Sequence, residues 1–259
     1  MVMIYLVFII FGLSPSVIWL LFYLKKDAHP ESKRMVLKIF FYGMLAGLIA
    51  MMVELWVTWS IMFFIGRFVV SVPIFFFLFN QFIVVALVEE LSKLLIVREK
   101  VINDKEFDEP VDTMLYMIIA ALGFAALENF LVLLSLGKPF LIRDAAMVSS
   151  FRFLGATFLH ALASGTIGYY LALAFCDSKR RIGLVLKGVV IATAIHGLFN
   201  ISITMIERGL IDQKLSLFII SFGFLVILLI STSFFVSSRF KKLKKLKSTC
   251  HPFRQDKEL

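Results

Sequence analysis

The chain has 259 residues, of which 60% are hydrophobic, and it carries a formal net charge of +9. Its mean hydropathy is +0.93. A soluble domain of this length cannot bury so much apolar surface. Composition therefore excludes the water-soluble classes and predicts a multi-pass protein of the cell membrane.

Apolar stretches long enough to cross a bilayer, which takes about 20 helical residues, divide the chain into successive segments. We place seven of them, at about 2–24, 36–57, 74–97, 112–136, 153–175, 183–206 and 215–237. The connections are short, and neither an internal repeat nor a change of composition separates a second folded domain. The sequence thus predicts an all-α fold, a polytopic transmembrane helical bundle of about seven helices over residues 1–238. A basic cytoplasmic tail follows at 239–259.

Residues 58–73, between the second and third segments, are apolar but contain Gly66 and Arg67. Two placements are compatible with this pattern: an extension of either flanking helix, or a segment along the outer interface. Pro73 suits the first turn of the third helix, where a missing N–H costs no hydrogen bond.

The distribution of basic residues predicts the orientation in the membrane. Most of the 27 lysines and arginines follow the first, third and fifth segments or lie in the tail. Because lysine and arginine accumulate on the cytoplasmic side, we expect the N-terminus outside and the C-terminus in the cytoplasm. The tail sequence "RFKKLKKLK" is typical of binding to anionic lipid headgroups, and we expect no nucleic-acid partner.

The stretch "VVALVEELSKLLIV" (84–97) carries Glu89, Glu90 and Lys93 among aliphatic residues. Each charge costs about 2.5–3.5 kcal/mol at the centre of a membrane helix, whereas each aliphatic residue returns only about 0.3–0.6 kcal/mol. Lys93 is four residues after Glu89 and three after Glu90, so it can neutralise either carboxylate but hardly both. One glutamate is then free for chemistry.

Other polar residues lie in the next three segments. The fourth contains Glu128 and Asn129, the fifth His160, and the sixth His196 and Asn200. The four-residue spacing of the last pair places both on one helix face. Counting about 1.5 Å of rise per residue brings all these groups to depths that one cavity can share. Ionisable groups at such depths are functional candidates by default.

Two features around these groups affect the interpretation. Glu54 lies near the outer end of the second segment, where its side chain can reach the interface, so we do not expect it in the site. Small residues crowd the fourth to sixth segments, and pairs such as Ser164 and Gly168 have the spacing that allows membrane helices to approach closely. Close packing would make the polar groups rigid.

A carboxylate and two imidazoles around a small wet cavity can polarise a water molecule, either directly as a general base or through a bound metal. An asparagine can donate a hydrogen bond to an oxyanion. The sequence contains neither a serine or cysteine paired with histidine as a nucleophile nor an HExxH zinc helix. Water-mediated hydrolysis of an amide therefore fits better than acyl-enzyme chemistry.

Two other classes of function use intramembrane polar residues. A proton- or ion-coupled membrane transporter is the main alternative, because glutamate and histidine at mid-membrane are equally expected there. It predicts a continuous polar path and usually repeated halves, and the sequence indicates neither. A non-enzymatic scaffold would require all the polar groups to satisfy one another.

Four motifs, in order on successive segments, carry a resemblance to a known family. They are "EELSK" (89–93), "GFAALEN" (123–129), "FLHALASGTIGYYLA" (158–172) and "HGLFN" (196–200). Together they resemble the motifs of the PrsW family of intramembrane proteases, which is related to the CAAX prenyl endopeptidases. The likeness covers the third to sixth segments, so we take about 74–206 as the protease core.

The resemblance implies an intramembrane endopeptidase that makes the site-one cut in a single-pass membrane substrate such as an anti-sigma factor. It assigns Glu89 as the general base. It also assigns His160 and His196 to binding the water or stabilising the oxyanion, and Asn200 to completing the oxyanion hole. Spacing alone does not distinguish Glu89 from Glu90 as the base.

The resemblance also implies supporting roles. Glu90 would pair with Lys93, and Glu128 would orient a partner, with Asn129 beside it. The catalytic type stays open between a glutamate mechanism without a cofactor and a metal-dependent one. Zinc is the possible metal, because a carboxylate and two imidazoles form a plausible ligand set. Its ligands would be Glu89, His160 and His196.

Overall fold

The computed structural model describes residues 2–26, 31–102, 104, 107, 109–135 and 142–245. All regular elements among these residues are helices, which confirms the all-α prediction. In chain order they are α1 (Val2–Leu24), α2 (Lys33–Ser71), α3 (Pro73–Phe79), the π-helix η1 (Asn80–Leu87), α4 (Val88–Lys100), α5 (Pro110–Ser135), α6 (Ile142–Leu154), α7 (Ala156–Cys176), the short 3₁₀ helix η2 (Ser178–Arg180), α8 (Arg181–Ile211) and α9 (Leu215–Lys245).

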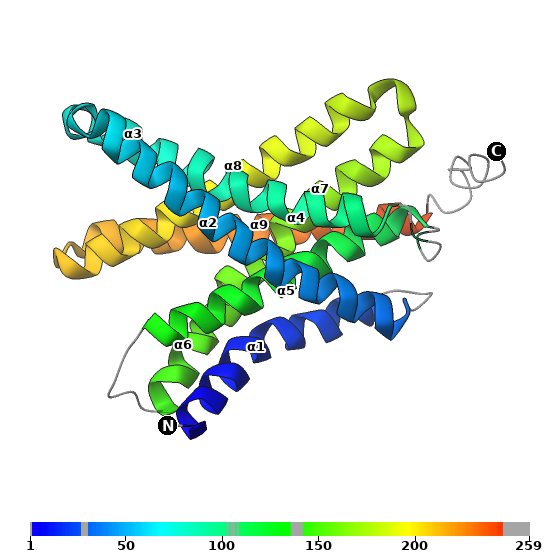
Figure 1. Ribbon diagram of the computed structural model, residues 1–259, viewed down its shortest axis with the longest axis horizontal. Coiled ribbons are helices and arrows are strands. Elements are labelled where there is room, and N and C mark those ends of the chain that lie inside the picture. The colour runs from blue at the N-terminus through cyan, green and yellow to red at the C-terminus, as the bar shows by residue number, and fades with distance from the viewer. Residues whose placement is uncertain are drawn as a thin grey trace.

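Within the described ranges, seven helical stretches are long and apolar enough to cross a membrane. They match the seven predicted segments, so the protein is a multi-pass membrane protein. The N-terminal end of α1 and the red C-terminal end of α9 lie toward opposite ends of the molecule (Figure 1). Which end faces the cytoplasm stays a prediction.

Residues 58–73 extend the second segment. The helix α2 continues to Ser71 with one kink at Ile65, where φ is −131° and ψ is 19°. A new helix, α3, then begins at Pro73, as its preference for the first turn predicts. The helix α9 also extends beyond its predicted range, to Lys245, so residues 239–245 of the predicted tail are helical. The rest of the tail, 246–259, lies outside the described residues.

The helix α5 is the centre of the bundle. Its residues 110–126 are all buried, and it packs against α7, α2 and α1 (Figure 1). A helix that is apolar on all sides is expected in such a central position. Gly168 of α7 allows a close approach to α5, since a Cβ at this position would lie 2.5 Å from the Cα of Met114. The predicted close packing of small residues is thus present between α5 and α7.

Candidate active site

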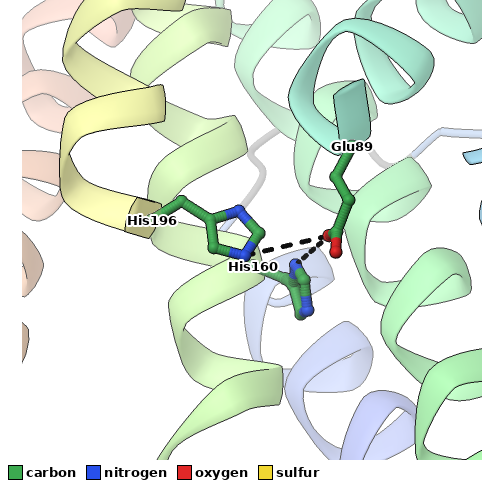
Figure 2. A group of neighbouring side chains, drawn as sticks. All are labelled: Glu89, His160 and His196. Atoms are coloured by element: carbon green, nitrogen blue, oxygen red, sulfur yellow. Dashed lines mark ion pairs between the residues drawn. The ribbon is translucent and has the colours of Figure 1, made fainter. Parts of the chain in front are cut away.

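Three helices meet at the predicted site. The helix α4 supplies Glu89, Glu90 and Lys93, α7 supplies His160, and α8 supplies His196. Glu89 is 7% exposed, and the other four are at most 2% exposed. Figure 2 shows the Glu89 carboxylate pointing toward both imidazole rings. Tertiary packing therefore brings together polar residues that lie up to 107 positions apart in the sequence.

The ammonium group of Lys93 contacts three acceptors. Its Nζ lies 2.8 Å from Glu90 Oε1, 3.3 Å from Glu89 Oε2 and 2.9 Å from His160 Nδ1. An ammonium has three N–H donors, so every one of them has an acceptor. Lys93 thus contacts both carboxylates, although its single positive charge can balance only one of them. The side chain fits between both, over the ring of Phe124 at 4.2 Å.

Glu90 is enclosed and fully hydrogen-bonded. Its Oε1 accepts from Lys93 and lies 3.0 Å from His196 Nδ1, while its Oε2 accepts a 2.7 Å hydrogen bond from Ser164 Oγ. Because carboxylate oxygens only accept, the Nδ1 of His196 must carry the proton of this contact. In the neutral ring the lone pair is then on Nε2, which faces Glu89.

A second chain of contacts fixes His160. Its Nε2 lies 2.7 Å from Glu128 Oε2, and the other oxygen of Glu128 forms a 2.9 Å ion pair with Arg152. Arg152 also donates to the Oδ1 of Asn129, whose amide nitrogen donates to Thr157 at 3.0 Å. Glu128 therefore sets the proton of the His160 ring on Nε2. The lone pair on Nδ1 faces Lys93 and Glu89.

Glu89 has fewer partners than Glu90. Its Oε2 lies 3.7 Å from His160 Nδ1 and 3.8 Å from His196 Nε2, beyond hydrogen-bonding distance. Both of these nitrogens carry lone pairs in the neutral tautomers derived above. Three acceptor atoms thus face a common centre, and Lys93 is the described donor that reaches it. Such a centre suits a water molecule or a cation.

The same centre fits the requirements of a zinc ion. Glu89, His160 and His196 each offer one ligand atom, and these atoms lie within 4.8 Å of one another. Histidines that bind metals usually donate their other N–H to a carboxylate or carbonyl. His160 does so to Glu128 and His196 to Glu90. The donor types and their hydrogen bonds match a catalytic zinc site with an open position for water.

Two local features of the backbone position Glu89. The π-helix η1 ends at Leu87, two residues before Glu89, and π-helical segments are frequent at functional sites. Phe82 of η1 packs against α8 beside His196. A Cβ at Gly197 would lie 2.3 Å from the Phe82 ring, so glycine at this position lets η1 approach α8.

A cavity of about 380 Å³ adjoins the site between α2, α5 and the η1–α4 segment. Glu89 and Glu128 line it, and so does Glu54. The sequence predicted an interfacial position for Glu54, which is wrong because α2 turns this residue toward the cavity. The volume falls within the range of about 300–1,000 Å³ that is usual for ligand sites.

Asn200 is half-buried one turn after His196 on α8. Within the part of the chain that the structure describes, no side-chain hydrogen bond joins Asn200 to Glu89, Glu90 or either histidine. Its assignment to the oxyanion hole stays a prediction.

Sequence reasoning missed two residues of the site, Arg152 and Ser164. Arg152 was not singled out, although it lies eight residues, about two helical turns, before His160. Ser164 is four residues after His160 and therefore on its face. Helical spacing from His160 was the available signal for both.

Comparisons with known proteins give a consistent result. Residues 31–231 match the family described as "PrsW family intramembrane metalloprotease". Protease PrsW of Geobacillus kaustophilus is 31% identical over 199 residues, which cover 76% of this chain and 80% of that protein. Protease PrsW of Bacillus subtilis is 30% identical over 199 residues, covering 76% and 83%. Protease PrsW of Clostridioides difficile is 33% identical over 132 residues, covering 50% and 53%.

The family match is wider than the four motifs that carry the resemblance. It includes α2 and the first half of α9, in addition to the range 74–206. No solved structure shows significant similarity to the chain.

Proposed function

The chain belongs to the PrsW family and is an intramembrane protease, and we propose that it is an endopeptidase that hydrolyses a peptide bond of a single-pass membrane protein. The observation that carries this proposal is the position of Glu89. Its carboxylate faces two imidazole lone pairs beside a cavity. These findings favour a protease over the ion-coupled transporter.

The proposed chemistry uses water as the nucleophile. Glu89 takes a proton from a water molecule while the water oxygen forms a bond to the peptide carbonyl carbon. Collapse of the tetrahedral intermediate breaks the C–N bond, and Glu89 returns the proton to the leaving nitrogen. His196 orients the water through its Nε2 lone pair, and His160 does so when its Nδ1 exchanges Lys93 for the water. The Lys93 ammonium, 3.3 Å from Glu89 Oε2, places positive charge beside the developing oxyanion.

A metal-dependent version of this mechanism uses the same residues. Glu89, His160 and His196 would hold a zinc ion, which when bound would polarise the attacking water. Lys93 would then give up its contact with His160 Nδ1 and keep those with the glutamates. Glu128 and Glu90 would continue to orient the two imidazole rings through their N–H groups.

Purified enzyme in detergent distinguishes the two versions. The assay measures cleavage of a single-span reporter peptide before and after treatment with a strong chelator, together with the zinc content per chain. A metal-dependent enzyme loses activity on chelation and regains it with zinc. Full activity without stoichiometric metal supports the glutamate mechanism. Absence of any cleavage that depends on Glu89 contradicts the proposed function.

The proposed substrate is an anti-sigma factor anchored by one membrane helix. The resemblance of the four motifs to the PrsW family supports this substrate class, as does a cavity that lies among membrane-spanning helices. The test compares membrane proteomes of cells with and without the chain. An uncut single-span anti-sigma factor should accumulate when the chain is absent, and accumulation of none contradicts this choice.

Anionic lipids are proposed partners of the cytoplasmic end. Lys244 donates to the backbone carbonyl of Lys26, and Lys241 lies nearby. Burial, together with Lys241 and Lys244, lowers the pKa of Lys26. The negative phosphate of a lipid headgroup would offset the repulsion among these three lysine side chains. Thermal unfolding in nanodiscs tests the idea: phosphatidylglycerol should stabilise the native chain more than a Lys241→Ala, Lys244→Ala variant.

A further inference from the structure

One wall of the cavity has a polar group that the proposed chemistry does not use. Gly47, Met51 and Glu54 lie at positions i, i+4 and i+7 of α2, so they share one helix face toward the cavity. The opposite walls come from Glu89 on α4 and Glu128 on α5. Glu54 is thus on the far side of the same space into which a substrate peptide must enter.

One carboxylate oxygen of Glu54, Oε1, is buried without a hydrogen-bond partner among the described residues. A buried acceptor without a donor is costly, and more so when it is charged. The last torsion of a glutamate is soft, so either oxygen can turn toward a donor that arrives in the cavity.

The charges around the cavity are unbalanced. Lys93 contacts Glu89 and Glu90, and Arg152 contacts Glu128. Among the described residues, no cation forms an ion pair with Glu54. The rest of the cavity wall is mostly apolar, with Met51, Val85, Phe124, Leu127, Leu131 and Val132. A ligand that matches this wall is an apolar peptide with one cationic side chain.

We propose that Glu54 is a specificity-determining residue that binds a lysine or arginine side chain of the substrate close to the scissile bond. This inference rests on the proposed endopeptidase function and adds the chemical class of the residue that the cavity recognises. The expected substrate is a membrane segment that is apolar except for one basic residue near the cleaved bond.

A binding experiment tests the proposal without requiring catalysis. The probes are two fluorescent peptides of about 20 leucine and alanine residues, identical except for a central lysine or glutamine. Binding to full-length protein carrying Glu89→Gln is measured by fluorescence anisotropy in detergent. The lysine peptide should bind about tenfold more tightly or better, which is the usual effect of one hydrogen bond to a charged group.

Substitutions of Glu54 in the Glu89→Gln protein test whether the Glu54 carboxylate recognises the charge of the central peptide residue. Glu54→Gln should reduce the ratio of the two affinities to about one, because the amide keeps the shape but loses the charge. Glu54→Lys should reverse the selectivity, favouring a third peptide with a central glutamate. The matched control is Glu207→Gln on the exposed surface of α8, which should keep the lysine preference. Size-exclusion chromatography checks the folding of each variant.

Several results would overturn the proposal. They are equal binding of the lysine and glutamine peptides, binding of neither, or a lysine preference that persists in Glu54→Gln. A loss of affinity for both peptides in equal proportion would also overturn it, since it would assign Glu54 to packing. Failure of the proposed function has a different signature: protein with intact Glu89 would bind the lysine peptide selectively yet leave it uncut.

Discussion

Glu89 and Glu90 are adjacent in the chain, yet their carboxylates lie in different surroundings. Glu90 accepts from Lys93 and Ser164, contacts His196 and has no exposed surface. Among the described residues, Glu89 accepts only from Lys93, at the longer distance of 3.3 Å, and it lines the cavity. A carboxylate with every oxygen occupied fixes its neighbours, whereas one with an oxygen to spare can take a proton. The geometry therefore supports Glu89 as the predicted base and Glu90 as the structural partner.

The largest expected effect is that of Glu89→Gln. The amide fills the same space but cannot take a proton from water, so cleavage should fall by about 10²–10⁴-fold. The rate of reporter cleavage by purified protein measures the loss. Protein yield and unfolding temperature should stay close to those of the native chain, because Glu89 has few contacts.

Glu99→Gln, an exposed change on the same helix, is the control for Glu89→Gln and should cleave normally. Substantial cleavage by Glu89→Gln would contradict the role of Glu89. If Glu90→Gln alone abolished cleavage in a well-folded protein, the assignments of base and structural partner would be reversed.

The second-largest effect is expected when the ammonium group of Lys93, which contacts both carboxylates, is removed. Lys93→Met leaves both glutamates buried without their cation, and breaking a buried ion pair typically costs about 3–5 kcal/mol. The amount of folded protein in the membrane, measured by size-exclusion chromatography after extraction, should drop sharply.

Double variants separate the two carboxylates. Glu90→Gln with Lys93→Met should recover much of the protein level, because it removes the most enclosed charge. Glu89→Gln with Lys93→Met should recover the protein level but should show no cleavage activity. If Glu89→Gln with Lys93→Met regained activity, the assignment of Glu89 as the base and Glu90 as the structural partner would be contradicted.

A smaller effect is expected from changes around His160, which faces Glu89. Glu128→Gln weakens the contact that orients His160, and changes to such partners typically cost about 10–100-fold in activity or metal affinity. Arg152→Gln should act in the same direction because it leaves Glu128 without its ion pair. Cleavage rate and zinc content together measure the effect.

Arg143→Gln is the matched control on α6, since its side chain is exposed and remote from His160. Native activity in Glu128→Gln would show that His160 is oriented by Lys93 alone.

The smallest effect concerns the backbone contact beside His196. Gly197→Ala introduces a Cβ that would lie 2.3 Å from the ring of Phe82, and overpacking of this kind typically costs about 1–3 kcal/mol. The unfolding temperature in detergent should fall, and cleavage should fall with it because η1 moves Glu89. Gly223→Ala, where nothing lies within 4 Å, should change neither. A Gly197→Ala protein as active and stable as the native chain would show that η1 adapts freely.

Much of the fold is predictable because membrane insertion is decided locally. Twenty successive apolar residues predict a spanning helix whatever lies around it, and the seven segments follow from that rule. Helical spacing likewise places Lys93 beside both glutamates, since residues three and four apart share a face. The resemblance of the four ordered motifs adds the family and the order in which its site residues occur.

Hydropathy does not predict how each helix is rotated, because every side of an apolar helix is equally compatible with lipid and with protein. Glu54 is an example: its place in the second segment was readable from the sequence, but the rotation of α2 toward the cavity was not. The position of Arg152 depends on how the α6–α7 segment packs beside α5.

The sequence by itself determined the membrane-spanning fold and which neighbours share a helix face, since these depend on composition and helical spacing along one segment. Only the tertiary structure decided that Lys93 reaches both carboxylates and His160, that Glu90 is enclosed while Glu89 faces a cavity, and that Glu54 lines the same cavity. These features depend on helix rotation and close approach, which are set by the packing of side chains from helices far apart in the chain.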